Sequence, residues 1–155
     1  MKRTDTSDWP CTIARASVIF GQSWNLLILR EAFYGNTRFD QLQKALGIGR
    51  NILTERLSTL IDEGLLTRDP YQEHPTRYEY SLTGKGRDTF PVLLAMATWG
   101  RAHTLGPDED PLIFEHQACG HDFDATAACS HCGAPVKLDE VTFRRGPGHP
   151  SYQLS

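Results

Sequence analysis

Apolar positions in the first hundred residues recur mainly at the spacing of helices. Apolar side chains follow helical intervals over residues 24–35, and Gly35 stands where such a helix would end. A shorter helix is expected over residues 38–46, capped by Asn36 or Thr37. The pattern therefore predicts one buried helix followed by a short amphipathic one.

A third helix is predicted over residues 50–63, after a glycine-containing break of only a few residues. Gly64 ends it. Its apolar stripe consists of Leu53, Leu57, Leu60 and Ile61. One face of this helix is expected to join the core, which leaves the opposite polar face free.

Two strand-like runs follow, over residues 65–71 and 77–82, joined by residues 72–76. Tyr78 and Tyr80 alternate with polar residues, as expected for a hairpin that is buried on one face. A longer helix then begins after Ser81 or Thr83, and Pro91 kinks or restarts it.

The apolar surface of this last helix is unusually wide. It carries Phe90, Val92, Leu93, Leu94, Met96, Ala97 and Trp99. A single small domain offers little surface to cover such a helix, so it is either central to the domain or shared with a second subunit. We therefore expect a homodimer.

This order of elements predicts a winged helix-turn-helix, mainly α with a small β-hairpin wing, in which one helix enters the DNA major groove and the wing reaches the backbone. Residue types at the start of the third helix suit base edges or phosphates, and those near the wing suit phosphate. The predicted DNA contacts are Arg38, Lys44, Arg50, Asn51, Thr54, Arg56, His74, Thr76 and Arg77. The alternative is a polar face that only contacts water.

Several of these residues belong to a longer recognisable pattern. Its most specific pieces are Cys11 ahead of a short helix, Trp24-x-Leu-Leu-Ile-Leu-Arg-Glu, Arg38-Phe39, Leu53-Thr54-x-Arg56-Leu57, Gly64-Leu65 and Arg77-Tyr78-x-Tyr80-x-Leu82-Thr83-x-x-Gly86. Over nearly two-thirds of its length the chain resembles the HxlR-type winged-helix transcriptional regulators, which are MarR-like.

The resemblance implies a homodimer built through the first and last helices, a palindromic operator, and local repression or activation of a neighbouring gene. Of these two effects on transcription, we expect repression. Gly49 departs from the family, which more often has a serine at that position, so a side-chain cap or a phosphate contact is missing there. The Gly49 amide is still expected to contact DNA.

The charge distribution separates two parts of the 155-residue chain, whose formal net charge is −3. Residues 1–100 hold twelve basic and eleven acidic residues, whereas residues 101–155 hold four and eight. DNA contact must therefore come from a local basic patch. The linker-like stretch 104–111 leads us to divide the chain into residues 1–105, the DNA-binding and dimerisation domain, and residues 106–155, a linker and a zinc-ribbon-like β segment.

The acidic segment contains two short motifs with the spacing of metal ligands. They are His116-x-x-Cys119-Gly120 and Cys129-x-x-Cys132-Gly133. Structural zinc takes four Cys or His ligands, and each two-residue spacer brings two of them to one ion. We expect a structural zinc site, with His121 or His131 as alternatives to the histidine ligand. Free thiols packed in a hairpin are the competing interpretation.

Two hypotheses concern the regulatory signal. Cys11, which precedes a predicted helix and a nearby arginine, is a candidate redox sensor of the kind known in some members of the resembled family, or simply a small buried residue. An aromatic cavity for a small-molecule effector would be lined by Phe20, Trp24, Phe33, Phe90, Met96 and Trp99, although such residues are more often plain core.

Other function classes receive less support from the residues. No nucleophile elbow, phosphate loop or paired-carboxylate motif is present, so we do not expect an enzyme. A zinc-stabilised protein interaction module without specific DNA binding is the alternative function. The chain lacks a membrane-spanning apolar run, and its first ten residues lack the apolar region of an export signal, so we expect a cytoplasmic protein.

Overall fold

The computed structural model describes residues 6–106 and 109–149, which leaves part of the predicted 104–111 linker and of the N-terminal ten residues outside the described ranges. The chain divides into two compact units, and the boundary lies between Thr89 and Phe90. The predicted division at 105/106 lies later in the chain. Contacts within the chain group the last long helix with the segment that follows it.

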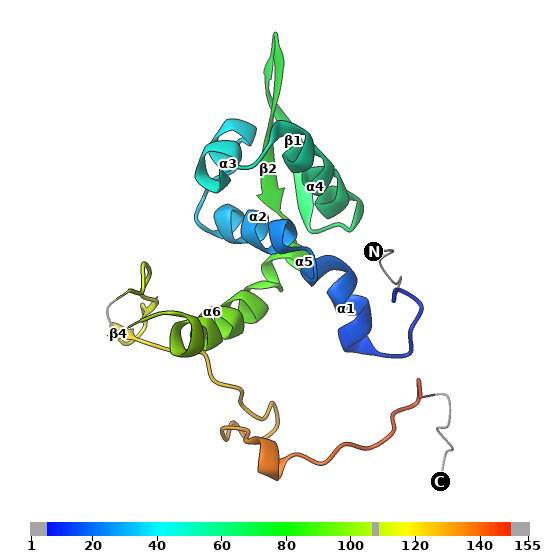
Figure 1. The fold of residues 1–155 in the computed structure, drawn as a ribbon, viewed down its shortest axis with the longest axis vertical. Coiled ribbons are helices and arrows are strands. Elements are labelled where there is room, and N and C mark those ends of the chain that lie inside the picture. The colour runs from blue at the N-terminus through cyan, green and yellow to red at the C-terminus, as the bar shows by residue number, and fades with distance from the viewer. Residues whose placement is uncertain (1–5, 107–108, 150–155) are drawn as a thin grey trace. The chain divides into compact units, whose positions relative to one another are not determined.

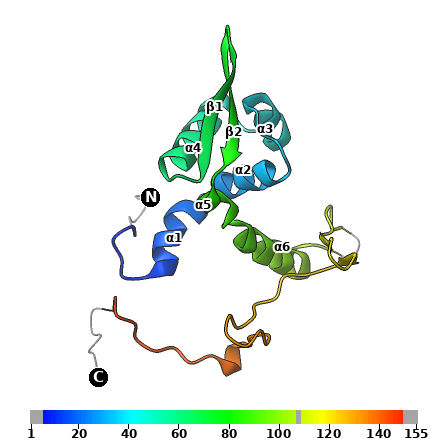
Figure 2. The ribbon, with the colours of Figure 1, turned by 180° about the vertical axis from the view of Figure 1, so that it is seen from behind.

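The first unit contains the predicted winged helix-turn-helix (Figure 1). Its elements are α1 (Thr12–Phe20), α2 (Ser23–Phe33), α3 (Phe39–Leu46), α4 (Arg50–Asp62), β1 (Leu66–Glu73), β2 (Thr76–Leu82) and α5 (Gly84–Arg87). Figures 1 and 2 both show α3 and α4 on either side of the base of the β1–β2 hairpin, with α2 crossing beneath. The wing is therefore mounted on the helix-turn-helix.

A leucine-rich core holds these elements together. The apolar stripe of α4 is confirmed for three of its four residues, because Leu53, Leu57 and Leu60 are at most 2% exposed, whereas Ile61 is half-buried. The stripe packs with α2 and with the first residues of the wing. The core also contains Ile28, Leu29, Leu42, Ile48, Leu65, Leu66 and Tyr80. Burial of each such side chain contributes about 1.5–3 kcal/mol, so this core fixes the orientation of α4.

The N-terminus of α3 is capped differently from the prediction. Its N-cap is Arg38, not Asn36 or Thr37. The Gln41 side-chain oxygen accepts hydrogen bonds from the backbone N–H groups of Thr37 and Arg38, at 3.2 and 3.0 Å. Asn36 is engaged elsewhere, since its Nδ2 donates to Glu31 at 2.6 Å. A side chain inside the helix thus supplies the cap.

The hairpin is longer and its turn tighter than the sequence pattern predicts. The strands extend to Glu73 and Thr76, so the expected loop at 72–76 was wrong. The Thr76 hydroxyl donates to the Glu73 carbonyl at 3.0 Å, which closes the turn. The antiparallel register is irregular between Pro70 and Gln72. Pairing reaches the tip because local side-chain bonds replace a longer loop.

The chain leaves the wing through a tight turn that requires glycine. The Thr83 hydroxyl accepts from the Gly86 N–H at 3.0 Å and donates to the Gly64 carbonyl at 2.7 Å. Thr83 therefore caps α5, and Pro91 lies at the start of a separate helix, which confirms the predicted restart. A β carbon at Gly86 would lie 2.1 Å from the Leu65 carbonyl oxygen.

The second unit consists of α6 (Phe90–Thr104), β3 (Glu115–His116), β4 (His121–Asp122) and the 3-10 turn η1 (Leu138–Glu140). The two short strands form an antiparallel pair. No residue of the described range 109–149 is buried. The Arg101 guanidinium on α6 binds the carboxylates of Asp110 and Asp124, which explains why this helix groups with the segment after it.

We predict that Gly86→Ala destabilises the first unit by about 1–3 kcal/mol, because the added methyl group meets backbone that cannot move aside cheaply. Equilibrium urea unfolding measures this. The matched control is Gly84→Ala in the same helix, where a β carbon would meet nothing within 4 Å. Equal stabilities of the two variants would contradict the steric explanation.

Candidate nucleic-acid interface

The predicted base-reading residues lie exposed on the N-terminal part of α4. Arg50, Asn51 and Thr54 all face solvent, opposite the buried leucine stripe. The Thr54 hydroxyl donates to the Arg50 carbonyl at 2.9 Å, which fixes its direction. Arg56 differs, because its side chain is only 19% exposed and is bound to Glu55 at 2.5 Å. Three of the four predicted readers are therefore available to a ligand.

Gly49 is the N-cap of α4, and no side chain caps the helix there. Its carbonyl accepts the first helical hydrogen bond, from the Leu53 N–H at 3.0 Å. The free N–H groups of the first turn, together with the helix dipole, favour a negatively charged partner at this end of α4. The residue thus lies where the predicted amide contact requires.

A groove joins the start of α4 to the wing. Its volume is about 500 Å³, and it is lined by Phe39, Asp40, Gln43, Arg50, Arg68, Tyr71, Thr76, Arg77, Tyr78 and Tyr80. The fold thereby brings Arg50, predicted as a base reader, to the same groove as Thr76 and Arg77, predicted as wing contacts. Two separate predictions from the sequence describe one surface.

Aromatic rings hold the guanidinium groups of this groove. Arg68 lies 4.4 Å from the centre of the Tyr78 ring, and Arg50 lies 5.4 Å from that of Phe39. Such stacking orients a cation without neutralising it. Within the described residues, neither arginine forms a salt bridge. The groove therefore presents positively charged groups that are already positioned.

Arg38, predicted as a backbone contact, has a second function in the fold. Its Nε donates to Glu79 at 3.0 Å, and its guanidinium lies 4.3 Å from the centre of the Tyr71 ring. The hydrogen bond to Glu79 raises the pKa of Arg38, so the group stays charged. Because Glu79 offsets this charge, Arg38 is better suited to fixing the wing on α3 than to binding phosphate.

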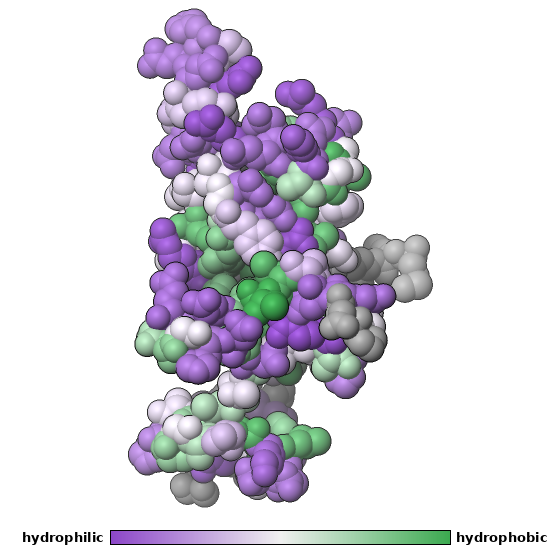
Figure 3. All heavy atoms as spheres, turned by 90° about the vertical axis from the view of Figure 1, so that its left-hand side faces the viewer, coloured by the Kyte–Doolittle hydropathy of each residue, from purple (hydrophilic) through white to green (hydrophobic). Residues whose placement is uncertain are grey.

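The remaining predicted contacts do not line the groove. Lys44 is exposed on α3, and His74 is exposed at the wing tip. Figure 3 shows that the wing end of the molecule is covered by hydrophilic side chains. Arg68 and Tyr71 were not predicted, because both lie on β1 and only the cross-strand register brings them beside β2, where Arg68 pairs with Tyr80.

The six residues predicted to line an aromatic cavity are not brought together within either unit. Phe20, Trp24 and Phe33 belong to the first unit and are half-buried. Phe90, Met96 and Trp99 lie on α6 in the second unit and are 38%, 49% and 62% exposed. None of the six lines the groove between α4 and the wing, and none lines the cavity around Arg101 in the second unit.

Cys11 is the N-cap of α1 and is exposed, so the alternative of a buried packing residue was wrong. Its carbonyl accepts from the Arg15 N–H at 3.0 Å, whereas no side chain caps the helix. The Arg15 Nε donates to the Trp9 carbonyl at 2.8 Å. The thiol is thus accessible to reagents at the first turn of a helix.

The four predicted zinc ligands lie in two pairs. His116 Nδ1 lies 3.3 Å from Cys119 Sγ. The backbone N–H groups of Cys132 and His131, followed by the Cys132 side chain, hydrogen-bond the Cys129 thiol and lower its pKa. In the described residues, no three His, Cys, Asp or Glu side chains lie close enough to hold a metal ion. The two pairs are therefore preformed but separate.

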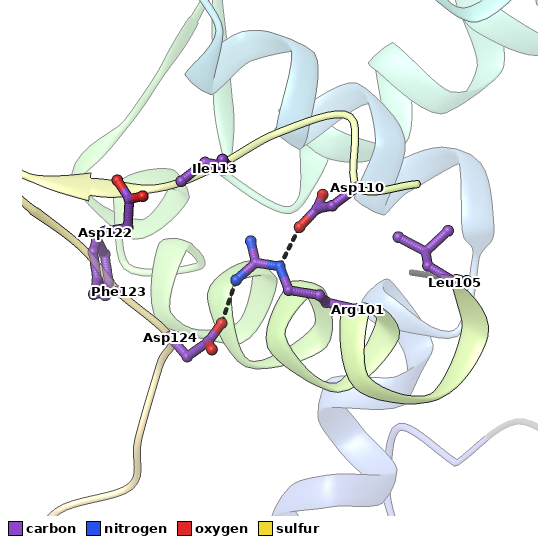
Figure 4. A pocket seen from close by; sticks show the side chains of 8 residues that line it. Arg101, Leu105, Asp110, Ile113, Asp122, Phe123 and Asp124 are labelled. Atoms are coloured by element: carbon purple, nitrogen blue, oxygen red, sulfur yellow. Dashed lines mark hydrogen bonds and ion pairs between the residues drawn. The ribbon is translucent and has the colours of Figure 1, made fainter. Parts of the chain in front are cut away.

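A second cavity, of about 790 Å³, lies within the second unit (Figure 4). Figure 4 shows the Arg101 guanidinium pointing between Asp110 and Asp124. The backbone N–H of Leu112, followed by Arg101, lowers the pKa of Asp110. The cavity is also lined by Leu105, Gly106, Ile113, Asp122 and Phe123. Among the described residues that line it, the one basic group, Arg101, is already paired with acids, so the cavity does not suit an anion.

Comparison with known proteins identifies the family. The model of the HxlR-like helix-turn-helix family matches residues 19–106. The chain belongs to this family. It is 42% identical over 137 residues to an HTH-type transcriptional regulator of Mycobacterium tuberculosis, with 88% of this chain and 87% of the relative covered. HxlR-like proteins are DNA-binding transcriptional regulators, so this chain is a helix-turn-helix transcriptional regulator.

Solved structures extend the similarity. The crystal structure of PA1607, a protein assigned as a transcription factor, gives a TM-score of 0.82 at 33% identity and covers 92% of this chain and 100% of its own. The redox regulator HypR in its oxidised form gives a TM-score of 0.56 at 28% identity, and the match covers 62% of this chain and 100% of HypR. Reduced YodB from Bacillus subtilis gives a TM-score of 0.53 at 27% sequence identity, and the match covers 63% of this chain and 98% of YodB.

The match to PA1607 is long enough to include the second unit. Coverage of 92% of 155 residues must include most of the region after Phe90, wherever the alignment begins. The HxlR-like winged helix therefore accounts for residues 19–106, and a fold shared with PA1607 continues beyond it. None of the described helices has the length and apolar character needed to cross a bilayer.

We predict that Arg68→Ala weakens binding to any duplex DNA and reduces the dependence of log affinity on log salt by about one, as the loss of one phosphate contact requires. Fluorescence anisotropy at several salt concentrations measures both quantities. Arg87→Ala is the control, because Arg87 is exposed on α5 outside the groove. An Arg68 variant that behaves like this control would remove Arg68 from the interface.

Proposed function

We propose that the chain is a transcriptional repressor that binds a palindromic operator as a homodimer in the cytoplasm. The observation that carries the proposal is the groove that joins Arg50 at the start of α4 to Thr76 and Arg77 of the wing. In a winged helix these two elements contact the major groove and the neighbouring backbone, respectively. A dimer bound across a promoter would exclude polymerase from it.

Base preference in this proposal comes from α4. Arg50 suits guanine and Asn51 suits adenine, whereas Thr54 suits a thymine methyl group or a phosphate. The wing residues Thr76 and Arg77, with Arg68 beside them, would bind phosphate and set the register of α4 in the major groove. His74 and Lys44 would add contacts at the edges of the site.

The dimer is supported by the exposed apolar surface of α6. Val92, Met96 and Trp99 lie at positions i, i+4 and i+7, so they share one helix face, and they are 37%, 49% and 62% exposed. On α1, Ile13 is 79% exposed. Apolar side chains gathered in this way mark association surfaces. A second copy of the same chain offers the matching face.

We predict that Arg50→Ala relaxes base preference at one operator position by about 1–3 kcal/mol, because a bidentate contact to guanine is lost. Selection of binding sequences from a random DNA pool by wild type and variant measures this. If the chain were instead a zinc-stabilised interaction module, the selection would enrich no sequence with either protein. Unchanged preference in the variant would move base reading away from Arg50.

We predict that Trp99→Arg raises the dimer dissociation constant by at least about thirtyfold, the effect of losing a central aromatic anchor worth about 2 kcal/mol. Sedimentation equilibrium over a range of concentrations measures the constant. Thr67→Arg introduces the same charge at an exposed position on β1 and serves as the control. Dimers of equal strength in both variants would exclude the α6 face from the interface.

The regulatory signal in this proposal is oxidation of Cys11. Its exposure at the start of α1 and the similarity to redox regulator HypR support this choice. Loss of two thiol hydrogens to an oxidant such as diamide would join the two Cys11 residues of a dimer. A small aromatic effector is the second candidate signal, resting on the prediction for Phe20, Trp24, Phe33, Phe90, Met96 and Trp99.

We predict that diamide changes operator affinity in the wild type and has no effect on Cys11→Ser. Mobility-shift titration measures affinity, and non-reducing electrophoresis with mass spectrometry follows the thiol. Reversal by dithiothreitol is expected, because thiol–disulfide exchange restores the reduced form. Full modification of Cys11 with unchanged operator affinity would exclude the redox signal and leave the aromatic effector.

A further inference from the structure

The C-terminal segment contains the same backbone turn twice. The Gly120 N–H donates to the His116 carbonyl, and the Gly133 N–H donates to the Cys129 carbonyl, each at 2.8 Å. Both glycines have left-handed backbone angles, with φ of 68° and 74°, a conformation that glycine adopts without strain. Each turn carries His or Cys at its first and fourth positions, so the repeated geometry positions metal-binding side chains twice.

The donors of the first turn already face each other at a suitable distance. His116 Nδ1 lies 3.3 Å from Cys119 Sγ, and two such atoms on a tetrahedral zinc ion lie about 3.5 Å apart, given Zn–N and Zn–S bonds of about 2.0 and 2.3 Å. His121 Nδ1 is instead bound to the Cys119 carbonyl, at 2.7 Å. The geometry therefore favours His116 over His121 as the ligand, because the Nδ1 atom of His121 already contacts a backbone carbonyl.

The second turn is built to hold a sulfur ligand. Cys129 and Cys132 stand at the first and fourth positions of this turn, which the Gly133 N–H closes by donating to the Cys129 carbonyl at 2.8 Å. Backbone hydrogen bonds around a pair of ligands, made by groups outside the ligand set, orient those ligands. The turn is further closed by the Cys129 N–H, which donates to the Ala134 carbonyl at 2.8 Å.

The segment around these turns has no apolar core of its own. In the described range 109–149 no residue is buried, and Leu138 and Phe143 are 83% and 84% exposed. Short segments that cannot bury a core commonly obtain their folding free energy from disulfides or a metal ion. The four cysteines of the chain form no disulfide. A bound metal ion would add folding free energy that the segment cannot obtain from an apolar core.

We propose that His116, Cys119, Cys129 and Cys132 bind one Zn²⁺ ion per chain in a closed structural site. The two turns are held as half-sites, and residues 123–127, which contain no helix or strand, connect them. Binding of the ion draws the half-sites together and releases the thiol protons. With four protein ligands no position is left for water, so the site braces the segment and performs no catalysis. The inference does not depend on the proposed repressor function.

Metal content of the full-length protein tests the site. The protein is purified without a metal-affinity tag and dialysed against a metal-free chelating resin, which removes loosely bound metal. Zinc is then quantified by plasma mass spectrometry. We expect about one zinc per chain in the wild type and in Cys11→Ser, and at least a tenfold weaker affinity in Cys129→Ser and Cys132→Ser. Retention of stoichiometric zinc by the last two variants, or no zinc in the wild type, would overturn the proposal.

Cobalt substitution tests the ligand set separately. Co²⁺ in a tetrahedral site with thiolate ligands gives intense visible bands and a thiolate charge-transfer band in the near ultraviolet. We expect these bands in the wild type and in the control His121→Ala, and their weakening in His116→Ala. The reverse order of the two histidine variants would overturn the assignment of His116. Equal circular dichroism of the variants in the helical region shows that the first unit stays folded.

Discussion

The packing of the α4 leucine stripe against α2 is the interaction on which the rest of the first unit depends. Leu53, Leu57 and Leu60 bury one face of α4 almost completely, with Ile28 and Leu29 of α2 in the same core. Because this packing buries one face of α4, the residues on its opposite face, including Arg50 and Asn51, are left in solvent. The direction in which α4 points its polar residues is thus decided by the buried leucines on its other face.

The wing is attached to that core at a few points. Leu66 and Tyr80 enter the core from opposite strands, and the Tyr80 N–H donates to the Thr37 carbonyl at 2.7 Å. Burial raises the pKa of Tyr80, which therefore stays neutral. Arg38 adds its contacts to Glu79 and Tyr71. The position of the wing relative to α3 thus rests on buried tyrosine, backbone pairing and one exposed ion pair, of which the exposed pair is the weakest contribution.

Periodic patterns allowed much of this fold to be predicted from sequence, whereas details that depend on pairing could not be. The helix over residues 50–63 was predictable because its leucines repeat at helical intervals and Gly64 follows. The Gln41 cap was missed because an ordinary polar helix residue carries no signal until the turn is built. Arg68 and Tyr71 were missed because their neighbours lie on another strand, across an irregular register. The spacing of the predicted metal ligands was visible, although the sequence could not choose among His116, His121 and His131.

The tip of the wing differs from the rest of the first unit in how freely it can change during evolution. Its turn at His74 and Pro75 is exposed and contributes nothing to the buried core, since the pairing and the Thr76 hydroxyl bond are local. Substitutions or insertions at this tip therefore cost little folding free energy. The buried leucine core is thus insulated from changes at the tip, because none of its side chains lies in this turn.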